Sequence, residues 1–562
     1  MIVRRLFPGL VNIREYEGSR RPDLIAGVVL AAILVPQGMA YAQLAGLPPV
    51  TGLYTTVACL VGYALVGPSR VLVLGPDSSI SPLILASTAP LLAGGDPGKA
   101  IVLAGMLAIL VGLVEIGLGI GKLGFVADLL SKEVQIGYMN GLGITIIMGQ
   151  LPKLFGFSTD GDSFLGEVKT FFQGLDQTDL TTLLLGLGVL AILLVLPKIT
   201  KKYPAVLVAV IAATVVSAAF GLSAHGVDTV GTLPQGIPAP SIPFTEASDV
   251  VPLLIAAFGI ALVSLTDTIA TATAFANRRG DEIKANQEMI GIGTANIAAG
   301  LFQGFAVSTS GSRTAVAEQS GARTQLTGLV GAGLVAALLL FLNGLLADLP
   351  QTALAAVVIA AALSLMDLGL LRRYFDVRRS ALGVSLVATA GVIFLGVLQG
   401  IVIAVALAII LFFRRNWWPH GAVLGRLGDG QDWQGLTDFP DAEEVPGVVI
   451  YRWEAPLFFA NASRFREEVR RLVKERQPAW VVIQCEAVTD VDVTAAEMIE
   501  QLDLELNSAG IHLAFVEMRK RLQDLTRQYG LMDSVDRQNF YPTIETALAA
   551  IESKRDEIPG NA

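Results

Sequence analysis

The stretch VLVLGPDSSIS, residues Val71–Ser81, decides the fold of this chain together with a second stretch like it, FAVSTSGSRTAV, residues Phe305–Val316. Each is a short apolar, extended run that stops at small or helix-starting residues and then opens a helix. An interrupted span leaves backbone N–H groups that lipid cannot satisfy, so it is tolerated only where protein or a water-lined cavity surrounds it. Two such breaks in corresponding places predict a transport site.

The composition places the chain among polytopic membrane proteins. Of its 562 residues, 53% are hydrophobic and only 16% are charged, and the mean hydropathy is +0.61. Residues 420–562 hold 15 Lys and Arg against 25 Asp and Glu, so the net charge of −9 belongs to the tail. An acidic tail without a basic cluster argues against nucleic acid or anionic lipid as its partner.

Apolar runs of about the twenty residues that cross a bilayer can be recognised along the chain. They begin near Leu24, Thr51, Leu72, Ile101, Gly124, Leu180 and Tyr203, and again near Val250, Glu282, Val307, Gln325, Thr352, Ala381 and Leu398. Cytoplasmic loops collect Lys and Arg. Such residues mark the N-terminus (Arg4, Arg5, Arg14, Arg20, Arg21) and the ends of the even-numbered runs (Arg70, Lys122, Lys198, Lys201, Lys202, Arg278, Arg279, Arg323, Arg372, Arg373, Arg378, Arg414, Arg415). The pattern predicts fourteen spans with both termini cytoplasmic.

Seven spans cross the membrane an odd number of times, so a second set of seven enters with the opposite orientation. We therefore expect a mainly α-helical membrane protein with a 7+7 inverted repeat. After the spans, amphipathic helices alternate with β-rich runs, which predicts a cytosolic α/β domain. The expected parts are a cytoplasmic N-terminus (1–21), a transmembrane part (22–416, repeats about 22–221 and 249–416), a linker (417–446), the α/β domain (447–552) and a tail (553–562).

Polar residues in the first span are candidates for the wall of a cavity. Pro36 removes a helix hydrogen bond, so we expect the helix to kink or unwind there. Gln37 and Tyr41 follow it, and a mid-span amide and phenol are costly unless they have partners. A simple packing kink is the alternative.

The first break predicts a helix that begins at Pro76 and carries Asp77 and Ser78 in its first turn. The free N–H donors and partial positive charge of a helix start suit an anion. Asp77 could occupy those donors itself as a cap, or it could couple transport to a cation or proton.

The second break holds a hydroxyl-rich helix start, Ser310, Gly311 and Ser312, followed by Arg313. Hydroxyls and backbone amides replace the hydration shell of a small oxyanion, and an arginine supplies fixed charge. An ionisable residue at membrane depth is a functional candidate. A structurally paired or snorkelling Arg313 is the alternative.

Asp267 lies in the middle of the eighth span, and Thr271 follows one turn later on the same face. A lone carboxylate at this depth is paired, coordinates a cation, or holds a proton. Pairing with Arg313 is one option, and a sodium ion at Asp267 and Thr271 is another.

Other kinds of chemistry find no support in the sequence. The two cysteines, Cys59 and Cys485, are far apart, and the three histidines, His225, His420 and His512, are scattered. We therefore expect no disulfide, no metal centre and no cofactor beyond a coupling H⁺ or Na⁺. Without a nucleophile-and-base constellation or a nucleotide loop, we do not expect an enzyme.

With these residues in view, the chain resembles the sulfate permease (SulP) family of anion transporters, the family related to prestin and pendrin. The resemblance runs from Asp23 to about Ala550 and rests on PQGMAYAQLAGLPPVTGLY, LGPDSS, STSGSRTAVAEQSGARTQLTG and a C-terminal domain similar to a STAS domain. It implies a core domain that moves against a gate domain, as in an elevator, usually in a homodimer in the cell (inner) membrane.

The resemblance also implies roles for single residues. Gln37, Tyr41, Asp77, Ser312 and Arg313 match substrate-site positions. Asp267 matches an acidic coupling position, and Thr271 matches a sodium-ligand position of bicarbonate-transporting relatives. Asp77 stands where prestin-like proteins have an aromatic residue, which favours coupling to H⁺ or Na⁺.

The STAS-like domain resembles bacterial anti-sigma-factor antagonists, which carry a phosphorylatable serine after a central strand. Thr494, in TDVDVTAAEMI, lies nearest to that position, and capping of the helix that starts there is the alternative role. The resemblance also implies a protein partner for this domain.

The expected function is secondary active transport of a small inorganic oxyanion, above all sulfate, coupled to H⁺ or Na⁺. Bicarbonate or a dicarboxylate is the alternative substrate. A membrane-anchored sensor or scaffold that signals through the STAS-like domain is the alternative of a different class.

Overall fold

The computed structural model describes residues 7–556 except 93–95, 125–130, 160, 162, 201–202, 429–431 and 532–538. The chain divides into two compact units, Met1–Ala408 and Ile409–Ala562. Four basic residues of the expected cytoplasmic loops, Arg4, Arg5, Lys201 and Lys202, lie outside the described residues. So do residues 557–562 of the expected tail.

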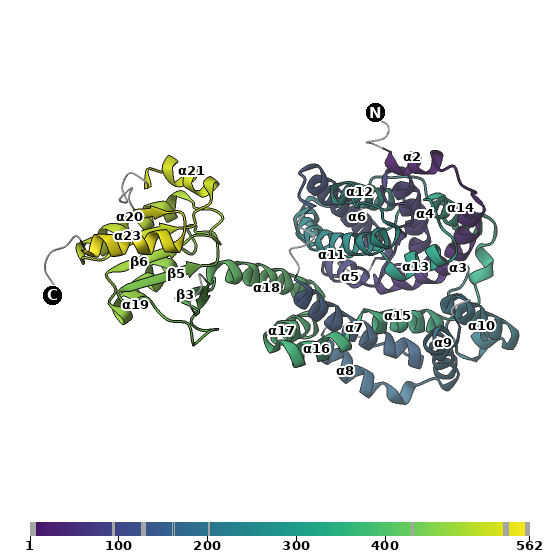
Figure 1. The fold of residues 1–562 in the computed structure, drawn as a ribbon. Coiled ribbons are helices and arrows are strands. Elements are labelled where there is room, and N and C mark those ends of the chain that lie inside the picture. Colours follow the sequence, from purple (N-terminus) through teal and green to yellow (C-terminus); the bar gives the residue numbers. More distant parts are fainter. Residues whose placement is uncertain are drawn as a thin grey trace. The chain divides into compact units, whose positions relative to one another are not determined.

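The first unit is built of helices (Figure 1). Its first half contains α2 (Pro8–Arg14), α3 (Arg21–Leu44), α4 (Pro49–Val66), α5 (Ser81–Thr88), α6 (Pro97–Ile120), α7 (Lys132–Phe155), α8 (Phe164–Gln173), α9 (Leu180–Ile199) and α10 (Ala205–Phe220). The second half contains α11 (Ala247–Arg279), α12 (Ala285–Leu301), α13 (Gly311–Gln319), α14 (Leu326–Phe341), α15 (Gln351–Leu365), α16 (Leu368–Val377) and α17 (Arg379–Leu395). Helix α18 (Val397–Trp417) begins in this unit and ends in the second unit. Short 3₁₀ helices lie at η1 (Ala89–Leu91), η3 (Leu175–Gln177), η4 (Leu222–His225) and η5 (Asn343–Leu346).

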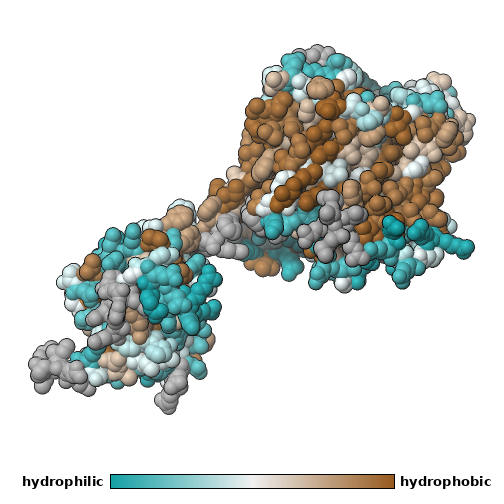
Figure 2. All heavy atoms as spheres, turned by 90° about the horizontal axis from the view of Figure 1, so that it is seen from above, coloured by the Kyte–Doolittle hydropathy of each residue, from teal (hydrophilic) through white to brown (hydrophobic). Residues whose placement is uncertain are grey.

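The helices have the length and the surface that a membrane requires. Among the described residues, six helices are long and apolar enough to cross a bilayer, and five shorter helices are apolar. Figure 2 shows a band of hydrophobic side chains over the helical unit, bordered by hydrophilic ones, whereas the C-terminal unit is largely hydrophilic. The expected helical membrane fold is confirmed, and the count of fourteen spans stays a prediction.

The helices of the first unit form two groups, which appear one above the other in Figure 1. The core group contains α3–α6 and α11–α14, and the gate group contains α7–α10 and α15–α17. Packing pairs repeat between the halves of the sequence: α6 packs on α12 and α4 on α14, while α7 packs on α17 and α9 on α15. In each case, replacing both helices of the first contact by their counterparts in the other half of the sequence gives the second contact, as an inverted repeat predicts. The groups meet where α3 contacts α15 and α10.

Glycines let α6 and α12 approach closely in the core group. Gly105, Gly112 and Gly119 recur every seven residues on α6, and Gly293 and Gly300 do so on α12. A Cβ atom on Gly293 would lie 2.6 Å from the carbonyl oxygen of Gly112. Small residues of this kind drive helix association in membranes, because lipid provides no hydrophobic driving force between helices.

Two amphipathic helices were not expected from the sequence. Helix α8 lies between α7 and α9, and α16 lies between α15 and α17, so each follows the fifth apolar segment of its half. Both have strongly one-sided apolar faces. At ten residues each, they are too short to span a bilayer.

Two local expectations about the spans need correction. Helix α3 runs without interruption through Pro36, so the proline does not unwind it. Helix α5 begins at Ser81, not at Pro76, and Pro82 is the proline in its first turn. The Asp77 carboxylate accepts a hydrogen bond from the Ser79 backbone N–H (3.0 Å), and such local bonding competes with helix formation.

The second unit is an α/β domain with a six-stranded sheet in the order β4–β3–β5–β6–β7–β8. The strands are β3 (Gly421–Arg426), β4 (Trp433–Gly435), β5 (Val448–Trp453), β6 (Trp480–Gln484), β7 (His512–Val516) and β8 (Phe540–Tyr541). The helices are α19 (Ala462–Arg476), α20 (Val493–Ser508), α21 (Lys520–Gln528) and α23 (Ile544–Asp556). Strands β5 to β8 are parallel, and β3 is antiparallel to its neighbours.

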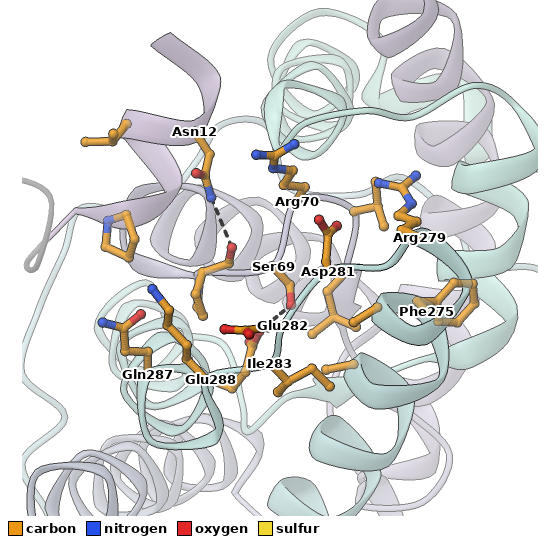
Figure 3. A pocket seen from close by; sticks show the side chains of 18 of the residues that line it. Asn12, Ser69, Arg70, Phe275, Arg279, Asp281, Glu282, Ile283, Gln287 and Glu288 are labelled. Atoms are coloured by element: carbon orange, nitrogen blue, oxygen red, sulfur yellow. Dashed lines mark hydrogen bonds between the residues drawn. The ribbon is translucent and has the colours of Figure 1, made fainter. Parts of the chain in front are cut away.

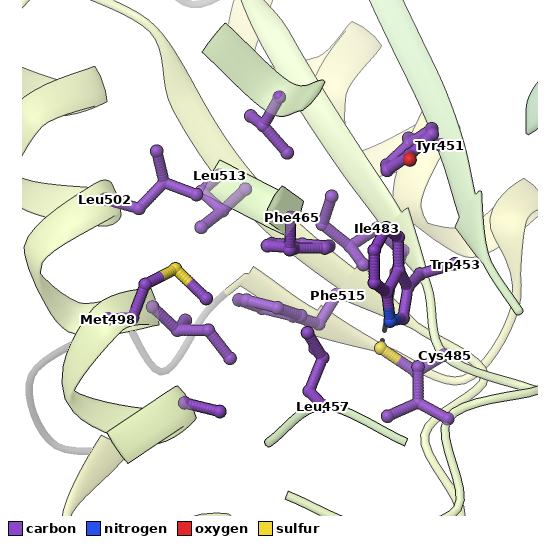
Figure 4. Close-up of a cluster of buried hydrophobic side chains, with 14 of the residues drawn as sticks. Tyr451, Trp453, Leu457, Phe465, Ile483, Cys485, Met498, Leu502, Leu513 and Phe515 are labelled. Carbon is purple, nitrogen blue, oxygen red and sulfur yellow. Dashed lines mark hydrogen bonds between the residues drawn. The ribbon is translucent and has the colours of Figure 1, made fainter. Parts of the chain in front are cut away.

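One face of this sheet carries a dense apolar core. Trp453 and Phe465 pack edge to face, with ring centroids 5.3 Å apart, beside Phe515 and Met498 (Figure 4). The range 417–446, which we expected to be a linker, contains β3 and β4 of the sheet. Helix α23 likewise continues past the expected domain end at 552.

Candidate functional site

The two broken spans lie side by side. Strand β1 (Leu74–Gly75) pairs in antiparallel fashion with β2 (Ser308–Thr309), with Gly75 opposite Ser308. The Ser310 N–H also donates to the Val73 carbonyl, at 3.2 Å. Antiparallel pairing of corresponding segments is what an inverted repeat predicts, and it satisfies backbone groups that lipid would leave unpaired.

Side chains of the core group hold the outer edges of this strand pair. The Thr314 hydroxyl accepts from the Val73 N–H at 3.1 Å, and the side-chain Oδ1 of Asn296 accepts from the Val307 N–H at 2.7 Å. The hydroxyls of Thr268 and Thr309 are 2.9 Å apart. The strand pair is therefore fixed from helices on both sides.

A buried carboxyl group orients Asn296. The Asn296 amide donates to Glu115 Oε2 at 2.8 Å, and Glu115 is fully buried in α6. Sequence reasoning missed both residues, although a carboxyl group inside an apolar run was a visible signal. Their role is to position the strand that leads to Ser310 and Arg313.

Arg313 joins the two breaks. Its side chain is only 1% exposed, and it donates to the Pro76 carbonyl (2.6 Å) and to Asp77 Oδ2 (3.3 Å). The partner of Arg313 is thus Asp77, and the pairing with Asp267 that the sequence left open does not occur. A Cβ atom on Gly75 would lie 2.9 Å from Arg313 Nη1, so a larger residue there would require the guanidinium to shift.

One hydrogen-bond donor of this ion pair has no partner in the described structure. Arg313 Nε has no hydrogen-bond partner within the described part of the chain. The side-chain Oε1 of Gln37, which lines the same cavity, is also buried without a hydrogen-bond partner among the described residues. Buried polar atoms without partners mark places where water or a ligand completes the structure.

Asp267 lies on α11 and accepts a hydrogen bond from Gln135 of α7 at 3.3 Å. Gln135 belongs to the gate group, so this bond joins the two helix groups across the site. Gln135 was not predicted, although an amide inside an apolar run could have indicated it. Thr271 follows Asp267 on the same helix.

All ten candidate residues of the transmembrane part line one cavity of about 1150 Å³. They are Gln37, Tyr41, Asp77, Ser78, Asp267, Thr271, Ser310, Gly311, Ser312 and Arg313. The opposite wall comes from the gate group, with Gln135 and Met139 of α7 and five residues of α15: Val357, Ala360, Ala361, Ser364 and Leu365. The cavity thus lies between the two helix groups.

A second cavity, of about 520 Å³, lies inside the core group between α2, the loop before β1 and the loop from α11 to α12 (Figure 3). Buried Glu288 accepts hydrogen bonds there from Tyr63 (2.6 Å) and from Ser69. Arg70, Arg279 and Lys284 line the cavity together with four acidic residues, so it has no excess of positive charge. Because none of the ten candidates lines it, we assign the transport site to the larger cavity.

Thr494 lies in the other unit and is the second residue of α20, where it is exposed. It does not cap the helix. That role belongs to Asp492, whose carboxylate accepts from the backbone N–H groups of Ala495 and Phe459, both at 2.8 Å. The capping role considered for Thr494 is therefore wrong, and its phosphorylation stays a prediction.

The described residues contain no cluster of three or more His, Cys, Asp or Glu suited to a metal ion. The two cysteines are buried and unbonded to each other. Burial raises the pKa of the Cys485 thiol to about 12, so it is not poised as a thiolate.

Comparison with known proteins points to one family. The model of the sulfate permease family matches residues 21–389, and the STAS domain model matches residues 439–547. A probable sulfate transporter of Mycobacterium tuberculosis is 42% identical over 97% of this chain and 98% of its own length. The chloroplastic sulfate transporter 4.1 of Arabidopsis thaliana is 29% identical over 97% of this chain and 82% of its own.

Solved structures share the fold. A structure of SLC26A9 aligns with a TM-score of 0.90 at 22% identity, covering 99% of this chain and 94% of that one. The transmembrane domain of the cyanobacterial bicarbonate transporter BicA aligns with a TM-score of 0.61 at 24% identity, covering 70% of this chain and 98% of that one.

Proposed function

Because this chain belongs to the sulfate permease family of anion transporters, we propose that it is a secondary active transporter of a small inorganic oxyanion, sulfate above all, coupled to protons. One observation carries the proposal: an acidic and a basic side chain, Asp77 and Arg313, are paired where two broken spans meet in the cavity.

The pair links anion binding to a proton by electrostatics. With Asp77 ionised, its charge offsets the guanidinium, and an entering anion is repelled by the carboxylate. A proton on Asp77 removes that repulsion and leaves Arg313 with a net charge for the anion. Arg313 Nε and the hydroxyls of Ser310 and Ser312 then supply hydrogen bonds. Proton and anion therefore bind together.

Asp267 gives the site a second acidic group. Its bond to Gln135 crosses from the core group to the gate group, so its charge state affects how the groups meet. A sodium ion at Asp267 and Thr271 is the alternative coupling ion, since carboxylate and hydroxyl oxygens suit a hard cation.

Alternating access follows from the division into two helix groups. We infer that the core group, which carries both broken spans, moves against the gate group in an elevator-like way. The protein works as a homodimer in the inner membrane, with both termini in the cytoplasm. The cavity between the groups supports this inference.

Sulfate is favoured over bicarbonate and dicarboxylates. The relatives that align over almost the whole chain at 42% identity are named as probable sulfate transporters. The bicarbonate transporter BicA is similar in fold alone. The sensor or scaffold alternative draws on the STAS domain and its exposed Thr494.

Uptake of labelled sulfate into proteoliposomes tests the proposal. We expect an inward-directed proton gradient to increase uptake, a sodium gradient to leave it unchanged, and excess sulfate to compete better than bicarbonate or succinate. Stimulation by sodium alone would replace H⁺ by Na⁺. Absence of transport of any of these anions would favour the sensor.

A further inference from the structure

Helix α16 carries a concentration of positive charge that the transport site does not use. Arg372 and Arg373 lie on its polar face, and Arg378 and Arg379 follow its last residue. All four are exposed, and none forms an ion pair within the described part of the chain. Asp376 is the one acidic residue among them.

The other face of α16 is apolar and open. Leu368 is 62% exposed, Phe375 58% and Val377 77%. The guanidinium of Arg379 lies over the Phe375 ring at 5.8 Å, so a cation sits at the edge of this face. A short helix with a basic and an apolar face is typical of segments that lie in a membrane interface.

The counterpart of α16 in the other half shows that this charge is not part of the repeated architecture. Helix α8 occupies the corresponding place and exposes apolar side chains such as Phe172, at 65%. Its own charges, Glu167 and Lys169, cancel. By the inverted topology the two helices face opposite leaflets, and only the one on the cytoplasmic side is basic.

Helix α16 is tied directly to the wall of the transport cavity. Helix α15 lines the cavity up to Leu365, and only two residues separate its end from α16. One of them, Asp367, caps α16 by accepting from the Leu370 N–H at 2.8 Å. Its own N–H donates to buried Asn140 of α7 at 3.1 Å. A ligand that holds α16 in place therefore also restrains α15 and α7 of the gate group.

We propose that α16 is a binding site for anionic phospholipid headgroups of the cytoplasmic leaflet. Arg372, Arg373, Arg378 and Arg379 bind the headgroup phosphates, and the apolar face rests against the acyl chains. Lipid is the occupant because its one molecule offers both an anionic and an apolar part. Occupancy of the site anchors the gate group, against which the core group moves.

A fluorophore on α16 measures this binding in the full-length protein. Because Cys59 and Cys485 are buried, a Val377→Cys variant can be labelled at that position alone. In proteoliposomes, we expect spin-labelled phosphatidylglycerol to quench the label more than spin-labelled phosphatidylcholine at equal content. The excess quenching should fall with salt. The apparent affinity for phosphatidylglycerol should fall about fivefold for each of the four arginines that is changed to Gln.

Two controls make the result specific. A label at Phe172→Cys on α8 should be quenched equally by both lipids, and Arg20→Gln with Arg21→Gln should leave the excess at position 377 intact. Equal quenching at position 377 by both lipids in the unmodified background would overturn the proposal, whatever the transport assays show. Full displacement by inorganic phosphate would also overturn it, because the ligand would then be a soluble anion.

Discussion

At the scale of single residues, the central feature is that the Arg313 guanidinium already has hydrogen-bond partners within the protein. It donates to a backbone carbonyl of the opposite break and to Asp77. In the proposed mechanism, the paired Arg313 binds an anion once the charge of its partner Asp77 has been neutralised. In that mechanism the pair links anion binding to protons, and in the structure it joins the two breaks.

A double-mutant cycle separates these two roles. Arg313→Gln leaves the Asp77 carboxylate without its partner, and we expect a loss of about 3 to 5 kcal/mol in the free energy of unfolding. Adding Asp77→Asn should recover most of that stability without recovering sulfate binding. Thermal unfolding and sulfate titration of the four proteins measure both. Recovery of binding in the double variant would exclude Arg313 as an anion ligand.

Glu545 predicts a pH dependence in the STAS domain. The Trp433 indole N–H donates to its carboxylate at 2.8 Å, and this bond lowers the pKa of Glu545 below its ordinary 4.5. The folded state thus gains stability that is fully present above pH 4.5 and is lost as the pH falls through the folded-state pKa. Glu545→Gln should flatten this dependence.

Tryptophan fluorescence reports mainly on this domain within the intact chain, because three of the five tryptophans, Trp433, Trp453 and Trp480, lie in its sheet, and the other two lie at the end of α18 and directly after it. The midpoint of urea unfolding, followed by fluorescence from pH 6 down to pH 3, measures the effect. An equal decline of the urea midpoint in the wild type and in Glu545→Gln would show that other titrating groups determine the pH dependence of stability.

At the scale of elements, the glycines between α6 and α12 determine how the core group closes. Gly293→Ala places a methyl group against the Gly112 carbonyl, and we expect it to cost about 1 to 3 kcal/mol of stability. Gly117→Ala on the same helix α6 meets no atom within 4 Å and should be neutral or stabilising. Thermal unfolding of the two variants in detergent compares them, and equal midpoints would contradict the packing argument.

The same scale shows what sequence reasoning can reach. The breaks, the start of α13 and the STAS helices follow from local patterns of glycine, proline and periodicity. The start of α5 at Ser81 does not, because Asp77 bonds its own turn and displaces the helix start. Strands β3 and β4 were missed because Gly- and Asp-rich sequence indicates a loop, and only the pairing of β3 with β5 and of β4 with β3 makes them strands.

The hydrogen-bond and ion-pair partners of buried polar groups could not be predicted from the sequence either. The sequence placed Asp77, Asp267 and Arg313 at membrane depth, but which carboxylate pairs with the guanidinium depends on how the two breaks align. The supporting residues Asn296 and Gln135 stand on helices that reach the site only through packing. Their selection needs the three-dimensional arrangement.

At the scale of the whole molecule, basic residues at the ends of the even-numbered spans predict that the two halves are inserted in opposite orientations. The amphipathic helices α8 and α16 offer a direct test. With both native cysteines buried, a membrane-impermeant maleimide added to intact cells should label Phe172→Cys and not Val377→Cys. Inverted membrane vesicles should give the reverse pattern. Labelling of both positions from one side would contradict the inverted repeat.

The proposed coupling requires that the protein takes up a proton at Asp77 when it binds an anion. Calorimetric titration of the purified protein with sulfate, in buffers of different ionisation enthalpy, measures that proton directly. For the wild type near neutral pH, we predict uptake of about one proton per sulfate bound. For Asp77→Asn, we predict binding without proton uptake. Sulfate binding to the wild type with no change in bound protons would contradict the account.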